Sequence, residues 1–383
     1  MFAFRDKTIY IISPEAWGVM RISKHHYAIE LARMGNRVFF FEPPTLQGST
    51  RGVLIPTNEG VRRVTYKPLA RGKKYVGSKL YALMQRRQIR RFIRELTGQP
   101  DVVWCFDQGT FDDLSIFGAP LCLFHPVDHN LERNMPPLAR TADLVFSTSP
   151  KILEYMCPSG TQGVVIHHGL NATFEQFARQ RLELMRGESG VPTFGGRIGF
   201  WGSLFKESLD RRKVLRLISA YPEYTFLCWG ASQMVQNNLA GKNDEEVAEF
   251  IRALASSPNV KMMGPGTAED FTAELPGLDV LINIEFEYSA RWDNGNPHKL
   301  MEYLSTGKPI FSTPALMYAD TDLLFISRSE DVVSDFRMLV EGWEDWASPL
   351  VSSKRISFAL QNTYRQQIDR IESHINRLGG EGS

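Results

Sequence analysis

The sequence lacks the features that mark disulfide-bonded, membrane-spanning and disordered proteins. Its 383 residues include only four cysteines, and no two of them form a C-x-x-C pair that would suggest a zinc or redox site. Glycine (30 residues) and proline (21 residues) are near average usage, which excludes collagen-like and low-complexity chains. No apolar run approaches the roughly 18 residues that a membrane-spanning helix needs. The remaining class is a globular chain of two or three domains.

An excess of charge of either sign is also missing. The 44 Lys and Arg residues balance 43 Asp and Glu residues for a net charge of +1, so the composition gives no general reason to expect nucleic-acid binding. Near the N-terminus, the apolar run at 9–12 ends at Ser13 and is too short for a secretion signal. We therefore expect a cytoplasmic protein with no membrane span and no nucleic-acid partner.

Short runs rich in β-branched and aromatic residues alternate along the chain with segments of helical period. This alternation predicts an α/β fold with parallel sheets covered by helices on both faces. The pattern restarts after a polar stretch at 175–196. It thus predicts doubly wound, Rossmann-like domains at 1–170 and 190–354, with a C-terminal helix at about 355–383 packing back on the first. The predicted strands are 8–12, 37–41, 102–106, 121–124, 144–147, 164–166, 197–201, 225–229, 260–263, 280–284 and 309–312.

The most distinctive motif begins at Gly295 and reads GNPHKLMEYLSTGKPIFST. Pro297 suits the start of a helix, and the unpaired N–H groups of a first helical turn favour an anion such as phosphate. Lys299 and Glu302 are three residues apart and share a helix face. The lysine can meet a diphosphate, and the carboxylate can accept hydrogen bonds from the vicinal hydroxyls of a ribose. The alternative is an ordinary surface ion pair.

This segment resembles the donor-binding segment of GT-B-fold glycosyltransferases of the retaining family 4 type, P-x-K-x-x-E-Y-L-x-x-G-x-P-[VI]. The resemblance implies two domains that face each other across a cleft, and a nucleotide diphosphate sugar, UDP- or GDP-linked, as donor. It also implies no metal and no other cofactor. Glu285 and Glu287 alternate along a strand and so do not form a metal-binding pair. The other matching segments are VVIHHGLNATF, GRIGFWGSLFKE, AYPEYTFLCWGA, NVKMMGPG and GLDVLINIEF.

The family pattern assigns donor-binding roles to residues of the second half. It implies that Glu302 holds the ribose and that Lys299 and Lys206 meet the diphosphate. Arg211 and Arg212 are fallbacks for Lys206, because many relatives carry an arginine where this chain has Ser203. Asn294 stands where the family has a glutamate, so the contact to the sugar hydroxyls is open. The full donor-binding prediction is Gly18, Arg21, Gly202, Ser203, Lys206, Met263, Gly264, Asn294, Asn296, Pro297, His298, Lys299, Leu300 and Glu302.

In the first half, polar residues follow two predicted strands. The resemblance places Gly18 and Arg21 in a glycine-bearing loop that faces the donor phosphates, with Ser23 as the N-cap of the next helix. The alternative is an exposed loop without a ligand. His125 or Asp128 resembles the family's active-site polar residue beside the sugar, and both are predicted as catalytic. A structural role for His125 is the alternative.

Twelve cations crowd into residues 62–94, with no acidic residue before Glu95. Tyrosine, leucine and methionine are interleaved with them, which is typical of an interfacial helix and loop on an anionic membrane. The alternatives are a solvated helix face and nucleic-acid binding. The residues predicted for the membrane or acceptor side are Lys73, Lys74, Arg86, Arg87, Arg90 and Arg91.

Taken together, these patterns predict a glycosyltransferase that moves a sugar onto a glycan or lipid-linked acceptor, in bacterial cell-surface polysaccharide synthesis. It is expected in the cytoplasm or on the inner face of the cell membrane. A nucleotide-sugar epimerase of the same fold and a non-catalytic sugar-binding protein are the alternatives.

Overall fold

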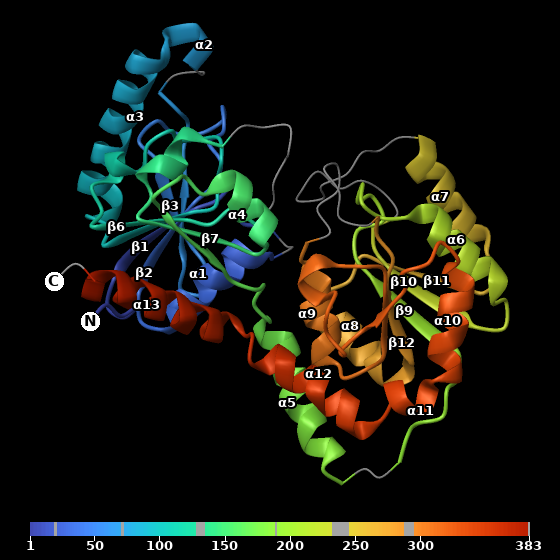
Figure 1. Cartoon of the computed structure of the whole chain (residues 1–383). Coiled ribbons are helices and arrows are strands. Elements are labelled where there is room, and N and C mark those ends of the chain that lie inside the picture. Colours follow the sequence, from blue (N-terminus) through green and yellow to red (C-terminus); the bar gives the residue numbers. More distant parts are fainter. Residues whose placement is uncertain are drawn as a thin grey trace. The chain divides into compact units, whose positions relative to one another are not determined.

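The computed structural model describes residues 1–18, 21–69, 73–127, 135–187, 190–231, 245–286 and 295–381, and of residues 73, 74 and 378–381 the backbone only. Two of the predicted site residues, Asp128 and Asn294, lie outside the described residues. The chain forms two compact units: Met1–His167 joined by Tyr364–Ser383, and His168–Thr363 (Figure 1).

A mixed, mostly parallel sheet is the centre of the first unit. Within the described residues it has eight strands in the order β3-β4-β2-β1-β5-β6-β7-β8, and only the β3–β4 pair is antiparallel. The order reverses direction between β1 and β5, the point at which open α/β sheets place ligands. The strands are β1 (Thr8–Ile12), β2 (Arg37–Phe41), β3 (Val53–Pro56), β4 (Arg62–Thr65), β5 (Val102–Cys105), β6 (Leu121–Phe124), β7 (Leu144–Ser147) and β8 (Gln162–Val165).

Helices cover both faces of this sheet. Successive side chains of a strand point to opposite faces, so Ile9 and Ile11 of β1 pack against α1 and α13, whereas Tyr10 and Ile12 belong to the core under α3 and α4. The helices are α1 (Ser23–Arg33), α2 (Lys73–Val76), α3 (Ser78–Phe92), α4 (Pro150–Met156) and α13 (Tyr364–Glu381), with short helical turns η1 (Ile93–Thr97), η2 (Leu114–Phe117) and η3 (Pro137–Thr141).

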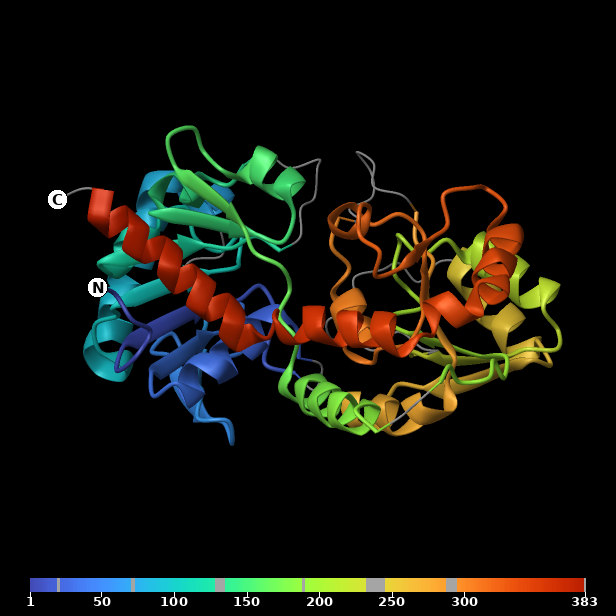
Figure 2. The same cartoon turned by 60° about the horizontal axis from the view of Figure 1, so that its bottom comes forward.

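The C-terminal helix α13 completes the first unit. Its buried isoleucines, such as Ile368 and Ile371, contribute to the core beside α1. The N-terminal segment lies along it, since the N–H of Phe2 donates to Asn376 (2.6 Å) and that of Phe4 to Glu372 (2.9 Å) (Figure 2). The prediction of a C-terminal helix that packs on the first domain is confirmed.

The second unit contains a parallel sheet. In the part of the chain that the structure describes, six strands follow the order β11-β10-β9-β12-β13-β14, which is the doubly wound Rossmann order with its reversal between β9 and β12. The strands are β9 (Arg197–Trp201), β10 (Thr225–Trp229), β11 (Val260–Gly264), β12 (Val280–Asn283), β13 (Ile310–Ser312) and β14 (Phe325–Ile326).

Two apolar clusters cover the two faces of this second sheet. Ile198 of β9 belongs to the cluster under α6, α7 and α10, and Leu281 of β12 belongs to the cluster under α5, α8 and α9. The helices are α5 (Ala172–Met185), α6 (Arg211–Ala220), α7 (Glu245–Ser256), α8 (Ala268–Glu274), α9 (His298–Ser305), α10 (Val332–Glu341), α11 (Trp343–Trp346) and α12 (Pro349–Leu360), with helical turns η4 (Leu275–Gly277) and η5 (Leu316–Tyr318).

The boundaries between the units differ from those predicted. The first half of the polar stretch at 175–196 belongs to helix α5, which is part of the second unit. Asn171 caps this helix by accepting the N–H of Phe174 (3.1 Å). The predicted helix at 355–383 is two helices. Arg355 of α12 is buried in the second unit, where it donates to Leu323 O (2.7 Å), so only α13 belongs to the first unit.

Three short strands, β3, β4 and β14, were not predicted from the sequence. The β4 strand carries Arg62 and Arg63, the first cations of the basic run, which the sequence assigned to an interfacial helix and loop. Arg63 instead pairs with Glu42 (2.6 Å), and Arg62 lies over the Phe39 ring (5.6 Å). Among the described residues, no helix combines the length and the apolar character needed to cross a bilayer.

Candidate functional site

The carboxyl ends of β9 and β12 form the switch point of the second sheet. The chain leaves β9 through Gly202, whose φ of +154° lies in the region that favours glycine. It leaves β12 through Ile284 into Glu285. The segment after Gly202 returns alongside, since the N–H of Phe286 donates to Ser208 O (2.7 Å). Two loops therefore meet at the edge where ligands of such sheets bind.

Glu285 is the centre of a charged cluster at this edge, although its side chain is fully buried. The Nζ of Lys206 lies 2.6 Å from its Oε2 and the Nζ of Lys299 lies 3.0 Å from its Oε1. The hydroxyl of Ser208 donates to Oε2 at 2.8 Å. Burial by itself would raise the pKa of Glu285, but the two lysines outweigh it and hold the pKa well below its ordinary range. The carboxylate is therefore charged.

The two lysines lead from this buried carboxylate toward the surface. The Lys206 side chain is 38% exposed and that of Lys299 is 12% exposed. Burial lowers the pKa of Lys299, and Glu285 opposes that effect. An ammonium has three N–H donors, and its contact with Glu285 uses one of them on each lysine. The cluster carries two positive charges and one negative charge, which suits it to bind an anion such as a diphosphate.

The residues around these lysines fix the loop rather than add cations. An added Cβ at Gly202 would be in ordinary contact with Cδ of Lys299 (3.7 Å), so the positive φ rather than a lack of space favours glycine there. The N–H of Phe205 donates to Ser203 Oγ (3.3 Å). Arg211, a fallback candidate for the phosphate, is buried and donates to the backbone oxygen of Lys206 (3.0 Å), so it holds the loop instead.

Glu302 lies one turn after Lys299 on α9 but has different partners. The Nδ2 of Asn171 lies 3.4 Å and the Nδ1 of His298 lies 3.5 Å from its Oε1. Burial raises the pKa of Glu302 to about 8, although a side-chain hydrogen bond with Trp201 lowers it in part, and burial lowers the pKa of His298 to about 4. Both groups are therefore mostly uncharged near neutral pH. The alternative of a Lys299–Glu302 ion pair does not hold, since Lys299 pairs with Glu285.

The other predicted donor-binding residues of the second unit divide into exposed and buried ones. Met263 is exposed at the end of β11, and Gly264 has a φ of +78° and accepts the N–H of Gly230 (2.9 Å). Asn296 is buried before α9. The Leu300 side chain lies wholly in the apolar core, which corrects its assignment as a donor contact. Pro297 is the N-cap of α9, so the predicted helix start is as expected.

In the first unit, Arg21 of the predicted phosphate-binding loop has partners within that unit. The Arg21 guanidinium lies 4.3 Å from the Trp17 ring centre, pairs with Glu59 (3.2 Å) and donates to Gly18 O. The predicted cap Ser23 is wrong by one position. Ile22 is the N-cap of α1, and its N–H is accepted by Nδ1 of His25 (3.2 Å).

His125, predicted as catalytic, has no exposed surface. Its ring stacks on Phe106 (5.0 Å between centroids), and its Nδ1 accepts the indole N–H of Trp104 (3.3 Å), which leaves the proton on Nε2. Burial lowers the pKa of His125 to about 3, so the ring is neutral at physiological pH. This is the environment of a structural histidine, and the catalytic role stays a prediction.

No protein-family model matches the sequence, and no curated protein matches it. Solved structures match nearly its whole length. A glycosyltransferase from Rickettsia africae ESF-5 is 13% identical, with a TM-score of 0.62 over 97% of this chain and 98% of its own. Alr3699/HepE of Anabaena in complex with UDP and glucose is 13% identical, with a TM-score of 0.63 over 97% and 100%. Sucrose-phosphate synthase from Thermosynechococcus elongatus is 13% identical, with a TM-score of 0.61 over 97% and 99%. The chain has the GT-B fold.

In this GT-B chain the basic run reaches the surface mainly along α3. Leu80, Leu83, Arg87 and Arg90 follow the spacing of a single helix face, and all four are exposed, the leucines by 51% and 63%. Arg86 is also exposed, although it lies 3.8 Å from Asp113, and Arg91 pairs with Glu95 (2.8 Å). The side chains of Lys73 and Lys74 lie outside the description.

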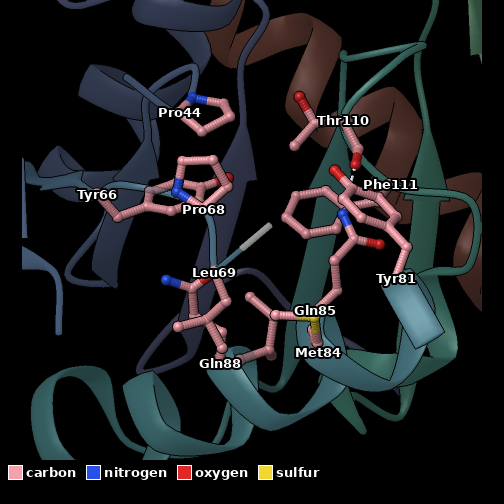
Figure 3. A pocket seen from close by; sticks show the side chains of 11 residues that line it. Pro44, Tyr66, Pro68, Leu69, Tyr81, Met84, Gln85, Gln88, Thr110 and Phe111 are labelled. Carbon is pink, nitrogen blue, oxygen red and sulfur yellow. Dashed lines mark hydrogen bonds between the residues drawn. The ribbon is translucent and has the colours of Figure 1, made fainter. Parts of the chain in front are cut away.

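The opposite face of α3 lines a pocket of the first GT-B unit (Figure 3). The pocket is lined by Tyr81 and Met84 of α3 and by Tyr66, Pro68 and Phe111. Its empty volume is about 350 Å³, which includes open solvent at its mouth. Two glutamines of α3 fix the surrounding loops: Gln85 donates to Thr110 O (2.6 Å) and Gln88 to Lys67 O (2.7 Å). The pocket is therefore mostly apolar and lies next to a basic surface.

Three residues of the site, Glu285, Ser208 and Asn171, were not predicted from the sequence to take part in it. Glu285 was considered only as a metal ligand and set aside. Its signal was a charged residue directly after the apolar strand β12, at the end of the strand where ligands bind. Ser208 and Asn171 have no local signal, because their contacts with Glu285 and Glu302 join segments far apart in the sequence.

Proposed function

We propose that this chain is a glycosyltransferase that takes a sugar from a nucleotide diphosphate sugar held by its second unit. The observation that carries the proposal is the pair of lysines, Lys206 and Lys299, gathered on one buried carboxylate at the switch point of a Rossmann-ordered sheet. A diphosphate needs such a partly exposed cationic edge. UDP is the favoured nucleotide, since a structure of the same fold was obtained in complex with UDP and glucose.

In the proposed reaction, the diphosphate is the leaving group. The two ammonium groups stabilise the charge that develops on it as the glycosidic bond breaks, which does not require a divalent cation. The first turn of α9, which follows Pro297, adds backbone N–H groups and the positive end of the helix dipole. Attack by the acceptor hydroxyl from the side of the leaving group retains the anomeric configuration, and the leaving phosphate takes the proton.

The remaining residue roles belong to the same proposal. Glu302 accepts hydrogen bonds from the ribose hydroxyls, and the loop at Met263 and Gly264 contacts the base. His125 or Asp128 is next to the transferred sugar, and Asn294 replaces a glutamate at the sugar hydroxyls. These assignments rest on the resemblance of the sequence to the family pattern.

A panel of UDP, GDP, ADP and dTDP sugars tests the proposal. We expect one base to raise the melting temperature clearly, and its sugar to be transferred to an acceptor when a glycan or lipid-linked glycan is added. If no nucleotide stabilises the protein, the proposal is wrong. Conversion of the donor sugar without any acceptor indicates the epimerase instead, and stabilisation without turnover indicates a sugar-binding protein.

We also propose that α3 places the enzyme on the inner face of an anionic membrane, where it meets a lipid-linked acceptor for cell-surface polysaccharide. The exposed stripe of Leu80, Leu83, Arg87 and Arg90 combines apolar and cationic side chains.

Flotation with vesicles tests this membrane contact. We expect wild-type protein to float with phosphatidylglycerol-containing vesicles and not with pure phosphatidylcholine, because juxtaposed cations bind anionic lipid. Arg87→Glu combined with Arg90→Glu should abolish flotation. Arg179→Glu on α5 combined with Arg186→Glu at its C-cap, where both arginines are exposed, is the matched control and should float normally. Equal recovery with both vesicle types would contradict the proposal.

A further inference from the structure

We propose that Glu285 is a positioning residue of the diphosphate site, which holds the ammonium groups of Lys206 and Lys299 in place and charged before the donor arrives. The inference rests on the proposed function, because it concerns the same anion. Glu285 does not itself touch the donor, since its side chain has no exposed surface. It acts through the two lysines, of which Lys206 is the more exposed.

The contacts of Glu285 are directed at the lysines more than at the loop fold. Its backbone is held without the carboxylate: its N–H donates to Thr313 Oγ1 (2.9 Å), and that hydroxyl donates to the Glu285 carbonyl (2.7 Å). The loop after β9 is also held by backbone bonds, from Phe286 N–H to Ser208 O and from Asp210 N–H to Ile284 O (3.2 Å). The loop backbone therefore does not depend on the carboxylate, whose contacts are with Lys206, Lys299 and Ser208.

A buried carboxylate without cationic partners destabilises the folded protein, because removal from water disfavours its charged form. It is compatible with the fold here because two cations and a hydroxyl surround it. The converse also holds. Without the negative charge, two ammonium groups would face each other in a partly desolvated edge, repel, and turn away or lose a proton. Glu285 therefore determines the direction of both lysine side chains and opposes the loss of the proton of Lys299.

The groups that affect the charge of Lys299 belong to three parts of the structure. Glu285 follows β12 and stabilises its ammonium, whereas Lys206, in the loop after β9, destabilises it. The Phe200 ring of β9 lies 4.9 Å from Nζ and favours the cation. On α9 itself, Glu302 is occupied with His298 and Asn171. Glu285 is therefore the anionic partner of Lys299 among the described residues, and its loss has a defined effect on that lysine.

Glu285→Gln tests the inference through the binding of UDP and of inorganic pyrophosphate by calorimetry. Removing a negative charge near an anion site should strengthen binding if electrostatics alone decided it. We expect the opposite: about tenfold weaker binding, because unpositioned lysines lose charge-assisted hydrogen bonds. In addition, the alkaline loss of affinity, followed from about pH 7.5 to about 10, should begin at lower pH in the variant than in wild type, because Lys299 loses its proton more easily.

Two further variants make the result specific. Glu285→Asp keeps the charge, so its alkaline limb should stay with wild type while its affinity falls, since the shorter side chain holds the lysines less closely. It also serves if Glu285→Gln does not fold. Asp322→Asn is the matched control, because it removes a carboxylate from an exposed lysine pair of the same unit (Lys354, 3.1 Å), and it should change nothing.

The outcomes separate the two proposals. If wild type binds neither UDP, GDP nor pyrophosphate, the proposed function is wrong and the role of Glu285 with it. If wild type binds and Lys206→Met weakens binding, but Glu285→Gln and Glu285→Asp bind as tightly as wild type or more tightly, only the role of Glu285 is overturned. The same holds if a folded Glu285→Gln loses affinity equally at every pH.

Discussion

The two sheets have the same strand order at their switch points. The carboxyl ends of their strands nevertheless carry different side chains. In the second unit, Lys206 and Lys299 extend from a buried carboxylate and keep N–H donors for a ligand. In the first unit, Arg21 is occupied by an aromatic ring and a glutamate, and His125 is enclosed by aromatic side chains. Topology therefore supplies an edge for a ligand, whereas the pairing of each cation decides which edge is prepared for an anion.

The largest expected effect that follows from this contrast is that of Lys206→Met. A charge-assisted hydrogen bond contributes about 1.5–3 kcal/mol, so the affinity for UDP should fall roughly 10- to 100-fold. Lys299 remains to neutralise Glu285, so the fold should persist. Calorimetry gives the affinity, and circular dichroism checks the fold. Wild-type affinity in this variant would remove the distinction between the two edges.

Glu302→Gln should give an intermediate effect, with a pH dependence. We expect roughly tenfold weaker UDP binding, because the glutamine amide has one oxygen acceptor for the vicinal ribose hydroxyls where the carboxyl group has two. The pKa of Glu302 in the folded protein, about 8, is above its ordinary value of 4.5. The stability that this group contributes is therefore present below about pH 4.5 and is lost as the pH rises to about 8.

Thermal melts from about pH 5 to about 9 measure this difference. The melting temperature of Glu302→Gln relative to wild type should rise across the range, because glutamine never ionises. His298 stays neutral throughout, since burial lowers its pKa to about 4. A constant difference at all pH values would show that Glu302 is already ionised in the folded protein.

His125→Phe should affect stability more than catalysis. It leaves the buried indole N–H of Trp104 without its acceptor, which costs about 1–3 kcal/mol of unfolding free energy. His125→Gln, which keeps an acceptor, should cost less. Urea denaturation measures both. Transferase activity per folded molecule should change little if Asp128 rather than His125 is next to the sugar, whereas a drop of more than about 100-fold with normal stability would support the catalytic role of His125.

The smallest expected effect is that of Arg21→Met, the counterpart of Lys206→Met in the first unit. Because its guanidinium is already paired with Trp17, Glu59 and the Gly18 carbonyl, UDP affinity should stay within about twofold of wild type. The same calorimetric titration compares the two variants directly. A loss as large as that of Lys206→Met would mean that both units contribute to the anion site.

Most of the sheet architecture could be predicted from the sequence, because buried parallel strands are short, apolar and rich in β-branched residues. β1, β2, β6, β7, β9 and β10 were predicted with the observed bounds. The strand β4 was missed because two of its four residues are arginines, although it lies between β3 and β2 in the sheet. Helix α5 was missed because its few buried residues, such as Phe174 and Ala178, are separated by charged ones.

The site was predictable where a local motif specifies it and not where distant segments meet. The motif around Lys299 and the loop at Lys206 identified two cations, yet neither shows that they share Glu285, which requires the adjacency of β9 and β12. Leu300 was assigned by its place in the motif, although the helical period turns its side chain into the core. The burial that makes Glu302 hold its proton has no sequence signature.

The discontinuous first unit has a consequence for synthesis. Its sheet is translated first, but one of the two helices that cover Ile9 and Ile11, α13, follows the whole second unit in the chain. The second unit is continuous, so it can fold as soon as it has left the ribosome. The first domain to be made is therefore the last to be finished, and until α13 is made, the part of its apolar sheet face that α13 covers is open to chaperones or other nascent chains.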